Sequence, residues 1–294
     1  MRSRAGVARD ATRPPMSPAE RPKRELPLRH AVTLGLLQGP TELLPISSSA
    51  HTTLLPWLAG WPYAELSDSL RKSFEVSLHA GAGAALAIHM RGELLRDAAQ
   101  LDGRRAGVIA LSLAPAALAG YMLGPAIERA LGEPGPIAAG LAAGGVAMAL
   151  ADRQAGTRGQ RARMQQDADA PDGLALGLAQ AAALIPGVSR NGATLTAARA
   201  RGFTRGASQG LSWHAGLPVI LGAGILKAAR MRREGVPREQ RAALAAGGAG
   251  AFVSTLACAR LLRRALRDGQ PLWPYSLYRC LLAALVLARM RRAA

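Results

Sequence analysis

The chain has 294 residues, of which 49% are hydrophobic, 4% aromatic and 19% charged, and its 37 basic and 19 acidic side chains give a net charge of +18. Soluble domains carry about a quarter charged residues, so this composition argues against an ordinary soluble enzyme. Two cysteines exclude a disulfide framework and a cysteine zinc site. The basic residues punctuate apolar blocks instead of alternating with aromatic residues, which favours membrane-flanking positions over a nucleic-acid surface.

The apolar blocks begin after a polar, arginine-rich segment at residues 1–29, which we interpret as a disordered basic tail. We expect a membrane region over residues 30–288, made of repeats at about 30–151 and 173–288, and a short basic tail at 289–294. Blocks with at most one charged residue match the roughly 20 residues that cross a bilayer as a helix; they are 74–90, 106–127, 134–151, 206–226, 242–259 and 270–288. The sequence therefore predicts an all-α, polytopic integral membrane protein.

Two further blocks, residues 34–53 and 176–194, run into a proline and then into small polar residues. Both begin Leu-Gly-Leu-x-Gln, close to half the chain apart, and a serine, Ser48 or Ser189, follows the proline by three positions. Such internal duplication is typical of transporter-type membrane folds. Because three spans follow each block, the repeats have opposite orientation. We expect each block to form a re-entrant hairpin, with both tips meeting in one polar site inside the bilayer.

Ionisable side chains at that depth are costly and suggest function. Here they are Glu42, His51, Glu75 and Arg190, with Arg279 nearer the end of the chain. Hydroxyl and amide groups accompany Glu42, His51 and Arg190: Ser47, Ser48, Ser49, Ser189, Asn191 and Thr194. An arginine, hydroxyls and N–H groups at a helix start together bind phosphate. His51 and Glu42 can move a proton, and an activated serine can act as nucleophile. A purely structural Glu42–Arg190 ion pair is the alternative.

Other phosphate chemistries lack their residues. No Walker-A lysine follows a glycine-rich loop, which excludes ATP as substrate. No histidine closely follows Ser189-Arg190, which excludes the machinery of the vanadium-haloperoxidase-like lipid phosphatases. The other histidines are interpreted as packing or interface residues: His30, His79, His89 and His214.

Residues 38–51, QGPTELLPISSSAH, resemble the first signature of the undecaprenyl-diphosphate phosphatase family, the bacitracin-resistance membrane phosphatases. Residues 186–194, PGVSRNGAT, resemble the second signature, and the resemblance extends over residues 28–288, including Tyr278-Arg279. It implies a hydrolase of the bacterial inner membrane that converts a C55 polyprenyl diphosphate to the monophosphate and inorganic phosphate. It also implies a site open to the extracytoplasmic face, recycling of the lipid carrier for peptidoglycan synthesis, and bacitracin resistance.

The resemblance assigns catalysis to four residues, Glu42, Ser48, His51 and Arg190, and phosphate binding to Ser47, Ser49, Ser189, Asn191 and Thr194. It also implies a divalent cation, Mg²⁺ or Ca²⁺, held by Glu42 and by the residue at position 38. The family usually has glutamate at that position, whereas this chain has Gln38, which removes one negative charge from the expected metal site.

Alternative functions stay open at this stage. A carrier that moves the polyprenyl monophosphate without hydrolysis would use the same inverted-repeat architecture, and a structural cell-envelope protein is a third interpretation. The expected partners are the lipid substrate and the bilayer, without nucleic acid, and a homo-oligomer is left open. The face of the six-span arrangement that has more basic residues changes when the long N-terminal tail is left out of the count, so the positive-inside rule assigns no orientation.

Overall fold

The computed structural model describes residues 25–157, 162–234, 238–266 and 270–293. These residues form helices joined by short connections, with no β-strand among them and one isolated bridge between Arg163 and Phe203. The predicted all-α class is confirmed. Of the tail predicted at residues 1–29, all but the last five residues lie outside the described part of the chain.

Six long helices correspond to the six predicted spans: α3 (Asp68–Ala99), α4 (Gly103–Leu131), α5 (Pro134–Thr157), α8 (Arg205–Glu234), α9 (Arg238–Leu266) and α10 (Trp273–Ala293). The first five contain their spans, whereas α10 begins three residues after the start predicted at residue 270. Even the 21 residues of α10 extend about 31 Å at 1.5 Å per residue, enough for a hydrocarbon core of about 30 Å. Within the described residues, three helices are apolar enough to span on composition alone: Gly103–Leu131, Pro134–Ala155 and Arg238–Leu261. α10 continues to Ala293, so most of the short C-terminal tail is its last turn.

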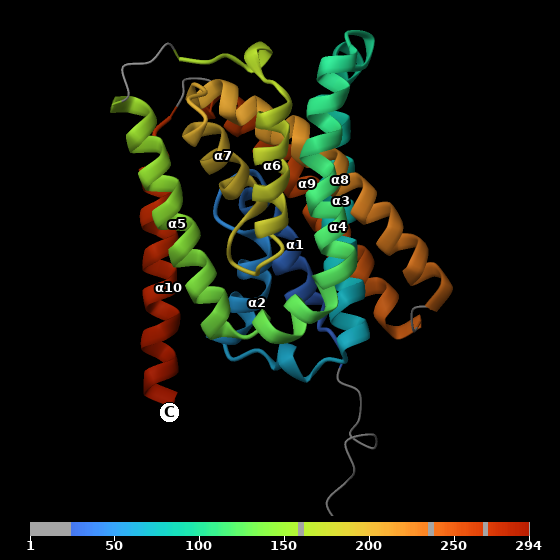
Figure 1. Ribbon diagram of the computed structural model, residues 1–294. Coiled ribbons are helices and arrows are strands. Elements are labelled where there is room, and N and C mark those ends of the chain that lie inside the picture. The colour runs from blue at the N-terminus through green and yellow to red at the C-terminus, as the bar shows by residue number, and fades with distance from the viewer. Residues whose placement is uncertain (1–24, 158–161, 235–237, 267–269, 294) are drawn as a thin grey trace, which may run out of the picture.

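Four short helices form two hairpins. Hairpin 1 joins α1 (Leu28–Leu43) to α2 (Ser48–Leu58), and hairpin 2 joins α6 (Ala170–Ala182) to α7 (Arg190–Ala200). Their helices have 11 to 16 residues and measure about 17 to 24 Å, too short to cross the core. Figure 1 shows the hairpins entering from opposite ends of the molecule, hairpin 1 from below and hairpin 2 from above. Single 3₁₀ turns lie outside them, at Pro62–Glu65 and Gln165–Asp167.

Each hairpin packs on a long helix of the other repeat. α1 lies along α9, and α6 lies along α4. Gly35 and Gly177, which hold equivalent places in the two repeats, make the two contacts possible: a Cβ on Gly35 would lie 2.4 Å from the carbonyl oxygen of Gly247, and one on Gly177 would lie 2.3 Å from that of Leu111. Only glycine permits backbones to approach this closely. The repeats are therefore interlocked, and α5 and α10 pair along one edge of the molecule (Figure 1).

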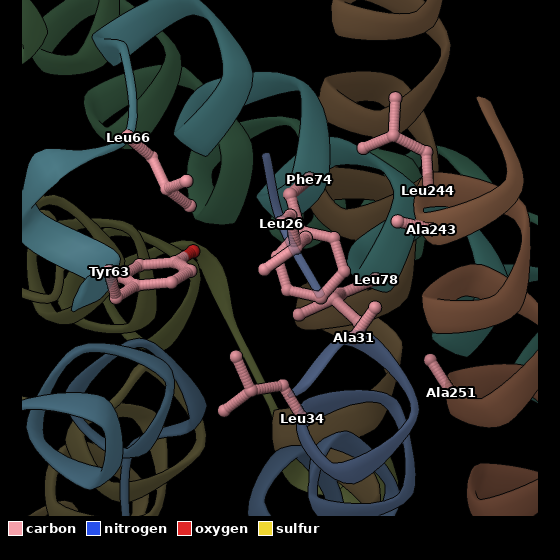
Figure 2. Close-up of a cluster of buried hydrophobic side chains, with 10 residues drawn as sticks. All are labelled: Leu26, Ala31, Leu34, Tyr63, Leu66, Phe74, Leu78, Ala243, Leu244 and Ala251. Carbon is pink, nitrogen blue, oxygen red and sulfur yellow. The ribbon is translucent and has the colours of Figure 1, made fainter. Parts of the chain in front are cut away.

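Apolar side chains pack around the base of hairpin 1. Figure 2 shows Phe74 and Leu78 of α3 facing Leu34 of α1, with α9 residues beside them. The whole buried cluster comprises Leu26, Ala31, Leu34, Tyr63, Leu66, Phe74, Leu78, Ala243, Leu244 and Ala251. Beside this cluster the rings of His30 and Trp61 stack, with centroids 3.8 Å apart.

The outer surface is apolar where a soluble protein would be polar. Leu118, Tyr121 and Met122 of α4 are exposed, and so are Leu281 and Leu285 of α10. Buried polar side chains lie inside instead, more than half of them on the two hairpins. An apolar exterior around a polar interior is the arrangement a bilayer requires, and the chain is a multi-pass membrane protein.

Candidate active site

Both hairpin tips end in the same backbone device. Ser47 (φ 76°) and Ser189 (φ 67°) adopt left-handed conformations that are unusual outside glycine, and each caps the helix that follows. The Ser47 hydroxyl accepts from Ala50 N–H at 3.4 Å, and the Ser189 hydroxyl from Gly192 N–H at 3.2 Å. Ser189 is thus the second repeat's counterpart of Ser47, and not of Ser48, because hairpin 2 has one more residue between its proline and its cap.

The tips meet at one carboxylate. Glu42, at the end of α1, is 7% exposed. Its Oε2 accepts from Ser48 Oγ at 2.7 Å and from Gln38 Nε2 at 3.2 Å, and its Oε1 accepts from Arg190 Nη2 at 3.4 Å. Ser48 and Arg190 are the first residues of α2 and α7. The first residues of two helices therefore contact Glu42, and helix N-termini favour anions. This contact confirms the prediction that the two tips meet.

Two arginines lie at this junction. Within the described residues, Arg190 Nη1 is buried and has no hydrogen-bond partner. The fully buried Arg279 of α10 binds backbone carbonyls of both tips: Pro45 O at 3.4 Å, Gly187 O at 3.1 Å and Val188 O at 2.8 Å. The Arg279 guanidinium thus binds the turns of both hairpins. The family resemblance included Arg279 only as a supporting match.

His51 is directed away from Ser48. Its Nδ1 lies 2.7 Å from Ser47 O and its Nε2 lies 2.7 Å from the Tyr278 hydroxyl. A carbonyl only accepts, so Nδ1 carries the proton, and Nε2 of the neutral ring accepts from Tyr278. Ser48 instead pairs with Glu42. No local pattern indicates the His51–Tyr278 contact, because the two residues are 227 positions apart.

The remaining predicted phosphate ligands divide into two groups. Ser49 is exposed at the tip of hairpin 1, and its hydroxyl lies 3.4 Å from that of Ser47. Asn191 and Thr194 are buried in a network with Leu43 and Ser212: Asn191 Nδ2 donates to Leu43 O at 2.8 Å, and Ser212 Oγ donates to Asn191 Oδ1 at 2.8 Å. Thr194 Oγ1 lies 2.6 Å from Ser212 Oγ. The structure uses Asn191 to tie hairpin 2 to the end of α1.

His79 enters the site although the sequence interpretation assigned it to packing. This α3 residue brings its Nδ1 to 3.4 Å from Gln38 Nε2 and 3.7 Å from Glu42 Oε2. Position 79 lies inside the predicted span 74–90, apart from both signatures, so only the packing of α3 beside α1 reveals it.

The donor set does not make a cation site by itself. Glu42 is the carboxylate at the tips, and it already accepts from three side chains, one of them a guanidinium. Gln38 supplies an amide oxygen, which is buried without a partner in the described residues. No cluster of three histidine, cysteine or acidic side chains suited to a metal occurs among the described residues. Mg²⁺ and Ca²⁺ prefer several oxygen ligands, carboxylates above all.

Comparison with known proteins places this geometry in a family. The family model described as "Bacitracin resistance protein BacA" matches residues 31–285, which include both hairpin tips. The chain belongs to this family. A relative from Geobacter sulfurreducens named undecaprenyl-diphosphatase is 42% identical over 276 residues, 89% of this chain and 97% of the relative. Relatives of the same name from Geobacter metallireducens (38%, 88% of this chain and 96% of the relative) and Thermomicrobium roseum (37%, 79% and 88%) also match.

Proposed function

We propose that this protein hydrolyses undecaprenyl diphosphate to the monophosphate and inorganic phosphate in the bacterial inner membrane. The observation that carries the proposal is the Glu42 carboxylate shared by Ser48 of one tip, at 2.7 Å, and Arg190 of the other, at 3.4 Å. The names of the relatives support this substrate. Recycling of the lipid carrier and resistance to bacitracin follow from that activity.

The charges of the junction suit a diphosphate. Glu42 pairs with the guanidinium of Arg190, and the guanidinium of Arg279 binds backbone carbonyls of the same two tips, so the tips carry two positive charges and one negative charge. The Nη1 of Arg190, which has no partner among the described residues, gives a second donor to a phosphate that binds in place of the weak 3.4 Å bond to Glu42. N–H groups at the starts of α2 and α7 add further donors aimed at the charge that develops on the transferred phosphoryl group.

Ser48 is the nucleophile in this proposal. Its hydroxyl proton moves to Glu42 Oε2 while Oγ bonds to the terminal phosphorus and the bond to the bridging oxygen breaks, releasing the lipid monophosphate. Water then hydrolyses the phosphoserine and releases inorganic phosphate. His51 and Tyr278 hold α2 to α10 and so fix the start of α2. In this proposal a divalent cation would enter the site bound to the diphosphate. None of the steps assigned here to the protein's side chains involves that cation.

The test is phosphate release from C55 diphosphate by the purified protein in detergent, with Arg199→Lys as the control for Arg190→Lys. Arg199 lies on the same helix but binds Asp152, with Nε 2.8 Å from Oδ1. We expect hydrolysis by the native and Arg199→Lys proteins. A native protein that binds the lipid phosphate but releases no inorganic phosphate would contradict hydrolysis and favour the non-hydrolytic carrier.

A further inference from the structure

Arg279 of α10 lies fully buried at the hairpin tips, and every hydrogen bond that it makes to the described residues goes to a backbone carbonyl. Three of these carbonyls belong to the tips, and the fourth, at 3.4 Å, is that of Gly140 on α5. The Nε of Arg279 is buried without a partner in the described part of the chain. A buried charge at membrane depth is costly and indicates a function, yet Arg279 takes part in none of the proposed steps.

Glycines from two other helices leave room for the Arg279 guanidinium. A Cβ on Gly144 of α5 would lie 2.2 Å from Arg279 Nη2, and a Cβ on Gly192 of α7 would lie 2.6 Å from Arg279 Nη1. Any larger residue at these two positions would displace the guanidinium. Because α5, α7 and α10 all contribute to this enclosure, the guanidinium is held in one place relative to the tips.

The serines at the two tips have backbone conformations that need support. Ser47 has φ 76° and ψ 93°, and Ser189 has φ 67° and ψ 116°. These ψ values lie outside the small left-handed region open to residues with a side chain, at about 30–60°. Strained conformations of this kind persist only where the surrounding structure fixes them. Arg279 supplies that support at hairpin 2, because its shortest hydrogen bond, 2.8 Å, is to the carbonyl of Val188, directly before Ser189.

The hydrogen bond to Val188 O also determines where the N–H of Ser189 points. The peptide group between Val188 and Ser189 is trans, so its N–H points away from its carbonyl and hence away from Arg279. Among the backbone hydrogen bonds of the described tips, Val188 N–H donates to Ile185 O at 3.1 Å, whereas Ser189 N–H donates to no carbonyl. Ser189 N–H can therefore join the N–H of Arg190, the first residue of α7, as a donor to an anion.

We propose that Arg279 is a positioning residue, which fixes the tip of hairpin 2 so that the N–H groups of Ser189 and Arg190 face the phosphoryl group in transfer. The start of α7 faces the junction, because the Arg190 side chain binds Glu42. The longer bond from Arg279 to Pro45 O, 3.4 Å, ties the tip of hairpin 1 to the same guanidinium. The inference rests on the proposed function and adds to it a side chain that acts through the backbone of the tips without touching the substrate.

The first test is Arg279→Lys, measured by phosphate release and by inhibition with orthovanadate, which adopts the five-coordinate geometry of a phosphoryl group in transfer. An ammonium lacks the planar fork that binds several carbonyls at once, so Ser189 N–H loses its fixed direction. Loss of one such donor costs about 10²–10³-fold in kcat. We expect kcat to fall about a hundredfold with KM unchanged, because Arg190 still binds the substrate, and the Ki of orthovanadate to rise by a similar factor.

The Ki of orthovanadate separates positioning from a merely structural role. If Arg279 only stabilised the fold, the variant would contain less folded protein and its maximal rate would fall, but the folded remainder would keep the native Ki. Arg199→Lys is the control, since Arg199 is a buried arginine that binds Asp152 and the carbonyl of Phe203. We expect the native Ki in this control.

The second test keeps Arg279 and moves its guanidinium. Gly144→Ala places a methyl group against Arg279 Nη2, and we expect the Ki of orthovanadate to rise and kcat to fall about tenfold. Gly135→Ala on the same helix is the matched control, because a Cβ there meets the end of the flexible Met290 side chain at 3.3 Å. We expect this control to keep the native Ki and kcat.

A native Ki in a folded Arg279→Lys protein overturns the inference, and if that variant does not fold, a native Ki in Gly144→Ala overturns it. A native protein that releases no phosphate removes the proposed function instead. Thermal melts with orthovanadate then decide the inference without hydrolysis. A rise in melting temperature in the native protein that is smaller in Gly144→Ala than in Gly135→Ala supports it, and equal rises, or none, overturn it.

Discussion

Hairpin 1 has a carboxylate where hairpin 2 has a leucine, and hairpin 2 has a guanidinium where hairpin 1 has a serine. When the two Leu-Gly-Leu-x-Gln segments are aligned, Glu42 corresponds to Leu184 and Ser48 to Arg190. The backbone is shared: both tips end in a left-handed serine that caps the next helix. The duplication therefore supplies two equivalent helix starts, and the divergence of two positions places a carboxylate and a guanidinium at one junction.

The equivalent glutamines illustrate the same divergence. Gln38 donates to Glu42 inside the site, whereas Gln180 donates to the carbonyls of Ser112 at 2.7 Å and Ala215 at 3.4 Å. One glutamine thus binds the carboxylate of the site, and the other joins α6 to its neighbouring helices. Sequence identity at equivalent positions does not imply an equivalent role, because each hairpin packs against a different set of side chains.

The largest expected effect comes from removing the carboxylate of hairpin 1. Glu42→Gln keeps the size of the side chain but cannot accept the Ser48 proton, so we expect phosphate release to fall about 10²–10⁴-fold. Leu184→Ala at the equivalent position of hairpin 2 should leave the rate of phosphate release close to that of the native protein. Comparable losses in both variants, measured at equal expression, would mean that the hairpins do not differ in role.

Arg190→Lys tests the guanidinium of hairpin 2. A guanidinium can bind two phosphate oxygens at once, whereas an ammonium is one compact charge. Loss of a charge-assisted bond costs about 1.5–3 kcal/mol, which corresponds to about tenfold to more than a hundredfold in rate. Steady-state kinetics of phosphate release measure the effect, and full activity in the lysine variant would make Arg190 structural.

Gly216→Ala changes the position of Arg190 without changing its chemistry. A Cβ on Gly216 would lie 1.6 Å from Arg190 Nη1, so the guanidinium must move. We expect about a tenfold loss of activity, since small misplacements of a binding group are costly. Gly222→Ala on the same helix is the control, because a Cβ there meets nothing within 4 Å. Equal activity of the two variants would show that the Arg190 position is not critical.

Replacing each of the two equivalent glutamines by glutamate should change a different property: the metal response of phosphate release at position 38, and the stability of the fold at position 180. Gln38→Glu adds a second carboxylate beside Glu42, so we expect phosphate release to acquire a stronger response to Mg²⁺ or Ca²⁺. In Gln180→Glu the new carboxylate would face two carbonyls, so we expect the free energy of unfolding to fall by about 1–3 kcal/mol. Identical metal titrations for native and Gln38→Glu proteins would remove position 38 from any cation site.

The smallest effect concerns the ion cluster where hairpin 2 begins. Burial raises the pKa of Asp172, but hydrogen bonds from Arg163 and Asp169, with Arg201, outweigh it and hold the pKa at about 2 against 3.8 when unpaired. A lowered folded-state pKa stabilises the fold above pH 3.8 and ceases to do so as the pH falls towards 2. Thermal melts of native and Asp172→Asn proteins should differ at neutral pH and converge on acidification. A difference that stays constant with pH would contradict this assignment.

The sequence by itself determined the membrane class, the places of the six long helices and the paired hairpins. Apolar length sets a membrane helix, and a proline followed by small polar residues interrupts one, so both features depend on neighbouring residues. The resemblance of residues 38–51 and 186–194 also indicated the family that the comparison confirmed. Counting from the prolines, however, matched Ser48 with Ser189, whereas the cap geometry matches Ser47.

Only the tertiary structure decided which side chains meet. Packing of α3 beside α1 brings His79 to Gln38 and Glu42, packing of α10 brings Tyr278 to His51, and the turns of both hairpins close around Arg279. These contacts join residues 41 to 227 positions apart, and they follow from the glycine-lined approach of the interlocked repeats. Side-chain spacing within one helix is fixed by its pitch, but contact between helices depends on how their surfaces fit, which no local pattern contains.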